Sequence, residues 1–433
     1  MNIRKAFRSL SVLWLGALAG AFFAFVTQAM LARALGAYEY GLFSAALATI
    51  AIVSPLAGFG VPGFWLRVFG EEGYKAFRWV QPSLLFIILT SSVLFILINI
   101  WASQSATTDA SRHLVMILSF YIFGQAAVEL SIAKAQLVGD YPKVAIWQAA
   151  PHFIRLFSIF FISCLLGGKV SGEYIAYCYS ILSILIALVC AFQLRDIILH
   201  RSVLAGHDQY GAALQFGLKE SPGVFNVAVG AFPYGAVGVL YLIYFQSSVV
   251  VLGMLAGPET AGIFNIAFVI LSAIYLFPSI VYQKFMMPMI QRWGCSDPAK
   301  SYFAYRAGGL MMLVVGMSIA LAVFFISPVA IPLIFGAEYS ISSEILRLLA
   351  ICIPLRFVSS SSGAFLNVGR HVGAKIIIMA IAAIINISIN FMVVPSYGLH
   401  GAVISVITTE AFLFIVFTLY AWNKIFQHER CAR

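Results

Sequence analysis

The sequence predicts an all-α membrane protein of about twelve transmembrane helices, arranged as two similar halves. Apolar residues make up 62% of the 433-residue chain and charged residues only 10%, which reverses the balance that keeps a globular surface in water. Apolar runs of about twenty residues, long enough to cross a bilayer, recur along the whole chain. No stretch between them is polar enough to form a separate water-soluble domain.

Hydropathy places the spans in order along the chain. Basic residues precede the first apolar stretch, as in a signal peptide, but the stretch from Leu10 to Leu31 has full spanning length, so we expect an uncleaved helix. The expected spans are 10–31, 43–66, 80–101, 114–138, 144–167, 174–194, 225–252, 263–282, 308–328, 345–368, 376–395 and 402–421. This pattern predicts an N-terminal bundle over 1–198, a cytoplasmic interfacial linker over 199–223 and a C-terminal bundle over 224–433.

Lysine and arginine are distributed unequally between alternate connections, which predicts the orientation of the chain. The side that has few of them holds only Arg33, Arg112, Lys169 and Arg347. The richer side holds the remaining connections and both termini, which are therefore expected in the cytoplasm. That orientation requires an even number of spans, in agreement with hydropathy, and it explains the net charge of +10 without nucleic-acid binding. We expect a multi-pass protein of the bacterial inner membrane.

The two halves share an internal repeat. The pattern Gly36-x4-Gly41-x-Phe43-x2-Ala46 after the first span recurs as Gly257-x4-Gly262-x-Phe264-x2-Ala267 after the seventh. A second, shorter repeat consists of Val138-Gly139 after the fourth span and Val368-Gly369 after the tenth. Because six spans separate the copies, the repeats are expected to be parallel, related by an axis along the membrane normal, an architecture suited to alternating access.

Three motifs at the outer ends of spans resemble those of the polysaccharide-export flippases, often called Wzx-type. They are Arg33-Ala-Leu-Gly36 with Glu39-Tyr40-Gly41, Ile334-Phe335-Gly336-Ala-Glu338-Tyr339, and Tyr397-Gly398-Leu399-His400-Gly401-Ala402. The resemblance covers essentially the whole chain. It implies the fold of the multidrug, oligosaccharidyl-lipid and polysaccharide exporter (MATE/MOP) superfamily. It also implies a substrate: an oligosaccharide on polyprenyl (undecaprenyl) diphosphate, moved to the periplasmic leaflet for O-antigen, lipopolysaccharide or other polysaccharide biosynthesis. Other membrane proteins of polysaccharide assembly, such as a polymerase, are partners by family analogy.

Two arginines lie near the middle of expected spans, where a charge is costly and usually faces the protein interior or a wet cavity. Arg155 shares a helical face with Gln148 and His152, and Arg356 shares one with Asn367. A cavity with both arginines would suit a lipid diphosphate, whose oxygens match the planar guanidinium. The alternative is that each arginine caps carbonyls or pairs with a buried carboxylate.

Further polar residues in the spans have two readings each. Glu129 is a candidate counter-ion to Arg155 or a proton or sodium site, and a simple salt bridge that packs helices together is the alternative. Glu410 poses the same choice, with structural pairing favoured. Asn386 and Asn390 lie one turn apart and are candidates for contacts with sugar hydroxyls, although hydrogen bonds across helices are commoner.

Two prolines are candidate hinges for alternating access. Pro55 belongs to a cluster with Gly58, Gly60 and Pro62 in the second span, and Pro233 interrupts the seventh. Proline and glycine are also frequent in transmembrane helices that have no gating role, so both readings stay open.

Two competing functions remain from the residues. A multidrug exporter of organic cations should have an acidic cavity, which the arginines disfavour, and a periplasmic glycan polymerase or ligase needs a larger outer loop. No catalytic set or metal cluster stands out, so we expect no enzyme, no metal and no cofactor. Exporting a diphosphate gains about 2.3 kcal/mol per charge per 100 mV, so either the membrane potential or coupling to H⁺ or Na⁺ supplies the energy.

Overall fold

The computed structural model describes residues 3–105, 108–165, 170–199, 201–205, 222–287, 289–290, 298–367 and 371–426. Within these ranges the chain forms helices and short turns, and no strand. Nine helices or helical runs in the described residues are long and apolar enough to cross a membrane. The protein is therefore an all-helical polytopic membrane protein, as the sequence predicts.

The expected spans and the nine candidates differ at two places. The first candidate, Ser11–Gln104, contains three expected spans in one run. The expected span 345–368 is absent from the candidates because it is divided into two shorter helices, α13 (Ser340–Leu349) and α14 (Cys352–Phe365). The division falls just before Pro354. Proline has no amide hydrogen, so Pro354 cannot donate the helical hydrogen bond to the carbonyl oxygen of residue 350.

The chain divides into two compact units, and each combines segments that are distant in sequence. Unit 1 comprises Met1–Met30 and Ala46–Val239, and unit 2 comprises Leu31–Ala45 and Leu240–Arg433. Two long helices, α1 (Ile3–Val53) and α9 (Val224–Leu255), each contribute to both units. The linker predicted over 199–223 lies mostly outside the described residues, and the second copy of the shorter repeat, Val368-Gly369, lies wholly outside them.

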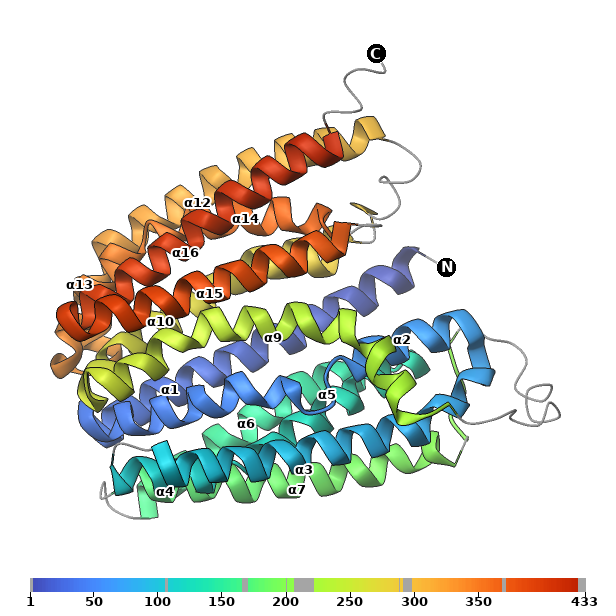
Figure 1. The fold of residues 1–433 in the computed structure, drawn as a ribbon, viewed down its shortest axis with the longest axis horizontal. Coiled ribbons are helices and arrows are strands. Elements are labelled where there is room, and N and C mark those ends of the chain that lie inside the picture. Colours follow the sequence, from blue (N-terminus) through green and yellow to red (C-terminus); the bar gives the residue numbers. More distant parts are fainter. Residues whose placement is uncertain are drawn as a thin grey trace. The chain divides into compact units, whose positions relative to one another are not determined.

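Unit 1 is built on close packing of α5 against α6 and α7 (Figure 1). Its helices, besides parts of α1 and α9, are α2 (Val61–Glu72), α3 (Val80–Ser105), α4 (Asp109–Leu118), α5 (Tyr121–Val138), α6 (Tyr141–Leu165) and α7 (Gly172–Ile198). Gly124 allows α5 to approach α7, because a Cβ there would lie 2.9 Å from the Ser183 backbone oxygen. Small residues at such contacts let the backbones of membrane helices pack tightly.

The expected second span is interrupted between α1 and α2. Pro55 lies in a 3-10 turn, Ser54–Leu56, and Gly58 and Gly60 both have positive φ. Gly60 also packs against α9, since a Cβ there would come within 2.3 Å of the Ala231 carbonyl oxygen. Pro233, by contrast, lies inside α9, which continues through it as a helix. The hinge roles predicted for both prolines remain predictions.

Unit 2 is built on the packing of α15 against α16 and of α14 against α12 and α16 (Figure 1). Its helices, besides α13, α14 and the remaining parts of α1 and α9, are α10 (Pro258–Ser279), α12 (Pro298–Phe335), α15 (Val372–Tyr397) and α16 (Leu399–Tyr420). Gly316 of α12 lies against Pro354 of α14, where an added Cβ would be 2.8 Å from the proline Cα.

The two copies of the repeated glycine pattern pack against each other in unit 2. Gly36 has φ +73° and kinks α1, and Gly257 has φ +96° before α10. A Cβ on Gly41 would lie 1.7 Å from the Pro258 carbonyl oxygen, and one on Gly262 would lie 3.1 Å from the Gly41 Cα. The repeat therefore encodes a helix crossing that only glycine permits.

The first two family-like motifs also meet in unit 2. Arg33 donates hydrogen bonds to the carbonyl oxygens of Leu333 and Ile334, the last turn of α12, which satisfies carbonyl groups that a helix end leaves unpaired. Tyr339 donates to the Ala32 carbonyl oxygen at 3.0 Å and meets the Tyr40 ring edge to face. These contacts explain why residues 31–45 belong to unit 2.

Candidate functional site

Arg155 of α6 is buried in unit 1 between two tyrosine rings. The residue is 6% exposed, and its guanidinium carbon lies 4.8 Å from the ring centre of Tyr121 and 5.2 Å from that of Tyr179. Its Nε has no hydrogen-bond partner, and no described carboxylate forms an ion pair with it. Aromatic faces attract a cation but do not neutralise it, so the site retains positive charge that an anion can pair with.

The face of α6 that carries Arg155 also carries Gln148 and His152, as their spacing predicts. Both are half-buried, and the Gln148 Oε1 is a buried acceptor without a partner. Gly20 of α1 permits close packing here, because a Cβ there would lie 2.5 Å from the Gln148 carbonyl oxygen and 3.5 Å from the His152 Cδ2. Unpartnered polar atoms on one face are suited to a polar ligand or to water.

Glu129 does not form the expected ion pair with Arg155. Its side chain is exposed on α5, and it pairs with no basic residue among those described. Glu129 therefore does not neutralise the charge of Arg155 in this structure. A role for Glu129 in ion coupling stays a prediction.

Arg356 of α14 is held in unit 2 by a carboxylate and three tyrosines. Its Nη1 lies 3.6 Å from the Glu410 Oε1 of α16, and the side chains are 15% and 2% exposed. The same Nη1 donates a hydrogen bond to the Tyr244 hydroxyl. The guanidinium carbon lies 4.9 Å from the Tyr241 ring centre and 5.4 Å from that of Tyr275. The pairing expected for Glu410 is thus present, and its other oxygen, Oε2, has no hydrogen-bond partner.

Asn367 is engaged by a lysine that the sequence analysis placed in a cytoplasmic connection. Lys375 of α15 is 9% exposed, and its Nζ donates to the Asn367 Oδ1 at 2.9 Å and to the Gly363 carbonyl oxygen at 3.1 Å. A buried lysine near a predicted span end has no distinct pattern in sequence, because charge counts treat it like any exposed lysine.

Asn386 and Asn390 belong to a hydrogen-bond network between α9, α15 and α16. Both side chains are 0% exposed. Asn386 accepts from Ser247 Oγ at 2.5 Å and donates to Thr409 Oγ1 at 3.1 Å, and Asn390 donates to Ser248 and Ser405. The two asparagines therefore form hydrogen bonds across helices, the commoner role for such residues. For either side chain to contact a sugar, this hydrogen-bond network must open.

Tyrosines are the part of both arginine centres that the sequence analysis missed. Tyr241 and Tyr244 are three residues apart and therefore share a face of α9, but Tyr121, Tyr179 and Tyr275 come from separate helices. Only the first pair has a spacing that could indicate a common site. No group of three or more His, Cys, Asp or Glu suited to a metal gathers among the described residues.

Comparison with known families decides the class of protein. A family model described as "Polysaccharide biosynthesis protein" matches residues 6–293, well over half of the chain. The chain belongs to this family. The family-level resemblance seen in the motifs is thereby confirmed, while a search of curated proteins gives no significant match.

Among the solved structures similar to this family member are several described as transporters or flippases. An inward-facing multidrug resistance MATE transporter of the MOP superfamily matches with a TM-score of 0.67 and 14% identity over 97% of this chain and 96% of that one. The lipid II flippase MurJ, in an inward closed conformation, matches with a TM-score of 0.68 and 14% identity over 97% and 93%. The eukaryotic MATE transporter AtDTX14 matches with a TM-score of 0.62 and 14% identity over 99% and 98%. The chain therefore has a MATE-like fold.

Proposed function

We propose that this protein is a flippase that moves a polyprenyl diphosphate-linked oligosaccharide from the cytoplasmic to the periplasmic leaflet of a bacterial inner membrane by alternating access. Twelve spans with both termini in the cytoplasm, in two parallel repeats, are part of this proposal. The family description supplies the link to polysaccharide biosynthesis. The fold is similar to that of MurJ, described as a lipid II flippase.

The observation that carries the proposal is the uncompensated charge of Arg155. Burying a guanidinium in a membrane protein without a carboxylate partner is costly, so such a group is usually retained for function. Two tyrosine rings hold it, its Nε lacks an acceptor, and no described carboxylate pairs with it. A diphosphate provides several charged acceptors that match the planar donors of arginine.

Arg356 differs from Arg155 because Glu410 and the Tyr244 hydroxyl already engage it. We keep Arg356 in the proposal as a second arginine that contacts the diphosphate, in which case the anion competes with Glu410. A carboxylate released from an arginine is then free to take up a proton or sodium ion, which is how Glu410 would couple transport to an ion gradient. Gln148, His152 and Asn367 are proposed to contact the same substrate, and Asn386 and Asn390 to do so if their network opens.

A multidrug cation exporter remains the alternative within the same fold. Its binding site needs negative charge to offset a desolvated cation. Arg155 supplies the opposite sign, so this centre favours an anionic substrate.

The test is accumulation of lipid-linked repeat units in the cytoplasmic leaflet of cells that depend on this chain. At matched protein levels, Arg155→Ala should reduce export about tenfold or more, since hydrogen bonds to charged groups contribute about 1.5–3 kcal/mol, and Arg155→Lys should retain part of it. The matched control is Arg67→Ala, which removes an exposed arginine paired with Glu71. Normal export by Arg155→Ala would contradict the proposal. So would efflux of organic cations that continues unchanged in cells lacking the lipid-linked glycan.

A further inference from the structure

A basic pocket lies in unit 1, separate from the residues of the Arg155 centre. It has a volume of about 610 Å³ and lies between the last turn of α5, the first turn of α6, the end of α7 and residues 201–203. Four basic and two acidic side chains line it: Lys134, Lys143, Arg195, Arg201, Asp140 and Asp196. All four basic residues lie near the ends of spans that the charge distribution predicts to be cytoplasmic.

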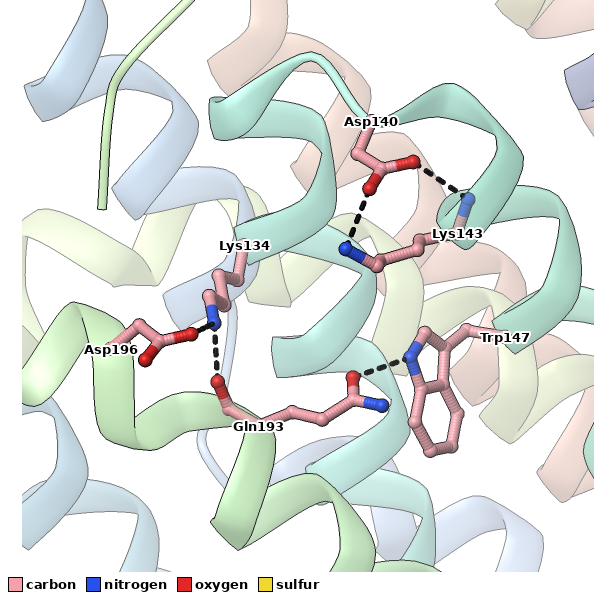
Figure 2. Close-up of polar contacts among 6 residues, drawn as sticks. All are labelled: Lys134, Asp140, Lys143, Trp147, Gln193 and Asp196. Atoms are coloured by element: carbon pink, nitrogen blue, oxygen red, sulfur yellow. Dashed lines mark hydrogen bonds and ion pairs between the residues drawn. The ribbon is translucent and has the colours of Figure 1, made fainter. Parts of the chain in front are cut away.

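Both acidic residues of the pocket are already paired with lysines. Figure 2 shows Lys143 bonded to Asp140 and Lys134 to Asp196. The first pair is 2.7 Å long, and the Lys143 backbone nitrogen also donates to Asp140 at 3.2 Å. The second is 3.4 Å long, and the Lys134 Nζ also donates to the Gln193 carbonyl oxygen. With each carboxylate paired to a lysine, the pocket keeps two positive charges in excess.

Arg195 and Arg201 are therefore the unbalanced charges. Both are exposed, and neither side chain has an ion pair or hydrogen bond among the described residues. Ser202, which also lines the pocket, is 6% exposed, and its Oγ has no hydrogen-bond partner. A ligand with several anionic oxygens would pair with both guanidinium groups and would give this hydroxyl an acceptor.

The frame of the pocket is fixed by hydrogen bonds. The Arg201 amide donates to the Asp196 carbonyl oxygen at 2.8 Å, and the Ala205 amide donates to that of Leu137 at 2.9 Å. Trp147 of α6 donates to the Gln193 Oε1 of α7 at 2.9 Å, as Figure 2 shows. A pocket whose walls are already tied together loses little entropy when a ligand binds.

Apolar side chains at the same pocket point to a ligand with a hydrocarbon part. Phe192 of α7 is 72% exposed and Val203 is 60% exposed, and both line the pocket. In a membrane protein, exposed apolar residues of this kind face lipid. Basic groups beside a lipid-facing surface at the cytoplasmic end of a span attract anionic headgroups.

From these contacts we infer that this pocket binds the phosphate group of a lipid in the cytoplasmic leaflet. The phosphate pairs with Arg195 and Arg201, while the acyl or prenyl chain runs along Phe192 and Val203. Two lipids carry such a group: an anionic phospholipid of the membrane, and a polyprenyl diphosphate. The inference holds for either source and does not require the protein to be a flippase.

The test uses the purified full-length protein and counts bound lipid by native mass spectrometry, with phosphatidylglycerol and sugar-free polyprenyl diphosphate as separate probes. Arg195→Gln combined with Arg201→Gln should weaken binding about fivefold for each arginine removed, because a basic residue near a membrane surface contributes about 1 kcal/mol. The matched control combines Arg67→Gln with Arg306→Gln, which removes two exposed arginines expected on the same side of the membrane.

The outcomes separate the sources. Selective loss of phosphatidylglycerol identifies a phospholipid site, and selective loss of polyprenyl diphosphate identifies a site for that lipid. The inference is overturned if the control double variant loses as much lipid binding as the pocket double variant, or if the pocket double variant binds both probes as well as the unaltered protein. It is also overturned if the protein binds inorganic phosphate but neither lipid. Ser202→Ala, which changes no charge, should weaken the same probe by a smaller factor, and it serves as the second variant if the double variant does not fold.

Discussion

Gly41 and Gly262, which occupy the same place in the two copies of the repeated pattern, pack directly against each other in unit 2. A Cβ on Gly262 would lie 3.1 Å from both the Cα and the nitrogen of Gly41. Nearby, Asn265 donates hydrogen bonds to the Tyr40 hydroxyl at 2.8 Å and to Ser44 Oγ at 3.1 Å. The repeat is therefore a physical contact, in which glycine allows two helices to approach and polar side chains hold them there.

Replacing Gly41 by alanine should destabilise unit 2. The new methyl would lie 1.7 Å from the Pro258 carbonyl oxygen, so the helices must separate, and overpacking of this kind costs about 1–3 kcal/mol. The measurement is the thermal unfolding midpoint in detergent. Gly309→Ala is the matched control, because nothing lies within 4 Å of a Cβ at that position of α12, and alanine there should be neutral or stabilising. Equal midpoints for the two variants would contradict the predicted close contact.

Removing one partner of the Arg356–Glu410 pair should cost more than removing both. Glu410 is 2% exposed, and leaving one buried charge without its partner costs about 3–5 kcal/mol. We expect Arg356→Met to be less stable than Arg356→Met combined with Glu410→Leu. A double-mutant cycle on unfolding midpoints measures the difference, and additive effects would show that the two side chains do not interact.

The tyrosine rings at Arg155 should matter more than their hydroxyl groups. The guanidinium lies over the faces of Tyr121 and Tyr179, and such contacts contribute about 0.5–2 kcal/mol. Tyr179→Phe should therefore keep most export of lipid-linked repeat units, whereas Tyr179→Leu should lower it. If both variants export equally well, the rings do not position Arg155.

The asparagine network predicts a loss of stability rather than a selective loss of sugar binding. Asn386→Leu leaves the Ser247 hydroxyl without its acceptor, and an unsatisfied buried group costs about 1–3 kcal/mol. The unfolding midpoint should fall, and export at matched folded-protein levels should be preserved. Normal stability combined with failed export would instead place Asn386 in contact with the substrate.

The Lys143–Asp140 pair makes stability depend on pH. The hydrogen bond from Lys143 lowers the pKa of Asp140 from its ordinary value of 3.8. A carboxyl group whose pKa is lower in the folded protein stabilises it above the ordinary pKa, and this contribution disappears as the pH falls through the folded-state pKa. Asp140→Asn should thus lower the unfolding midpoint at pH 7 but not at a pH well below 3.8. In a Lys143→Met background the pH-dependent effect should shrink, because only the hydrogen bond from the backbone nitrogen of residue 143 remains. An undiminished effect would exclude the Lys143 side chain as the cause.

Much of the candidate site is predictable from the sequence because a charge in an apolar run is conspicuous. Arg155, Arg356 and Glu410 are detectable this way, and helical spacing correctly puts Gln148 and His152 on the face of Arg155. Spacing says nothing about which helices touch, so the tyrosines from other helices and the buried position of Lys375 emerge only from packing. The structure likewise shows no ion pair between Glu129 and Arg155, one of the alternatives for Glu129, since two residues inside spans meet only if their helices and rotations allow it.

The sequence by itself determines that this chain is a helical membrane protein with a repeated glycine pattern and charged residues inside its spans, because hydropathy and local periodicity are properties of neighbouring residues. Tertiary structure alone decides that residues 31–45 belong to unit 2, where Arg33 ties them to α12 and Tyr339 to the 3-10 turn before α13. It also decides that Arg356 is neutralised by Glu410 while Arg155 is not. The physical reason is that pairing a charge depends on contacts between helices far apart in sequence, which no local pattern records.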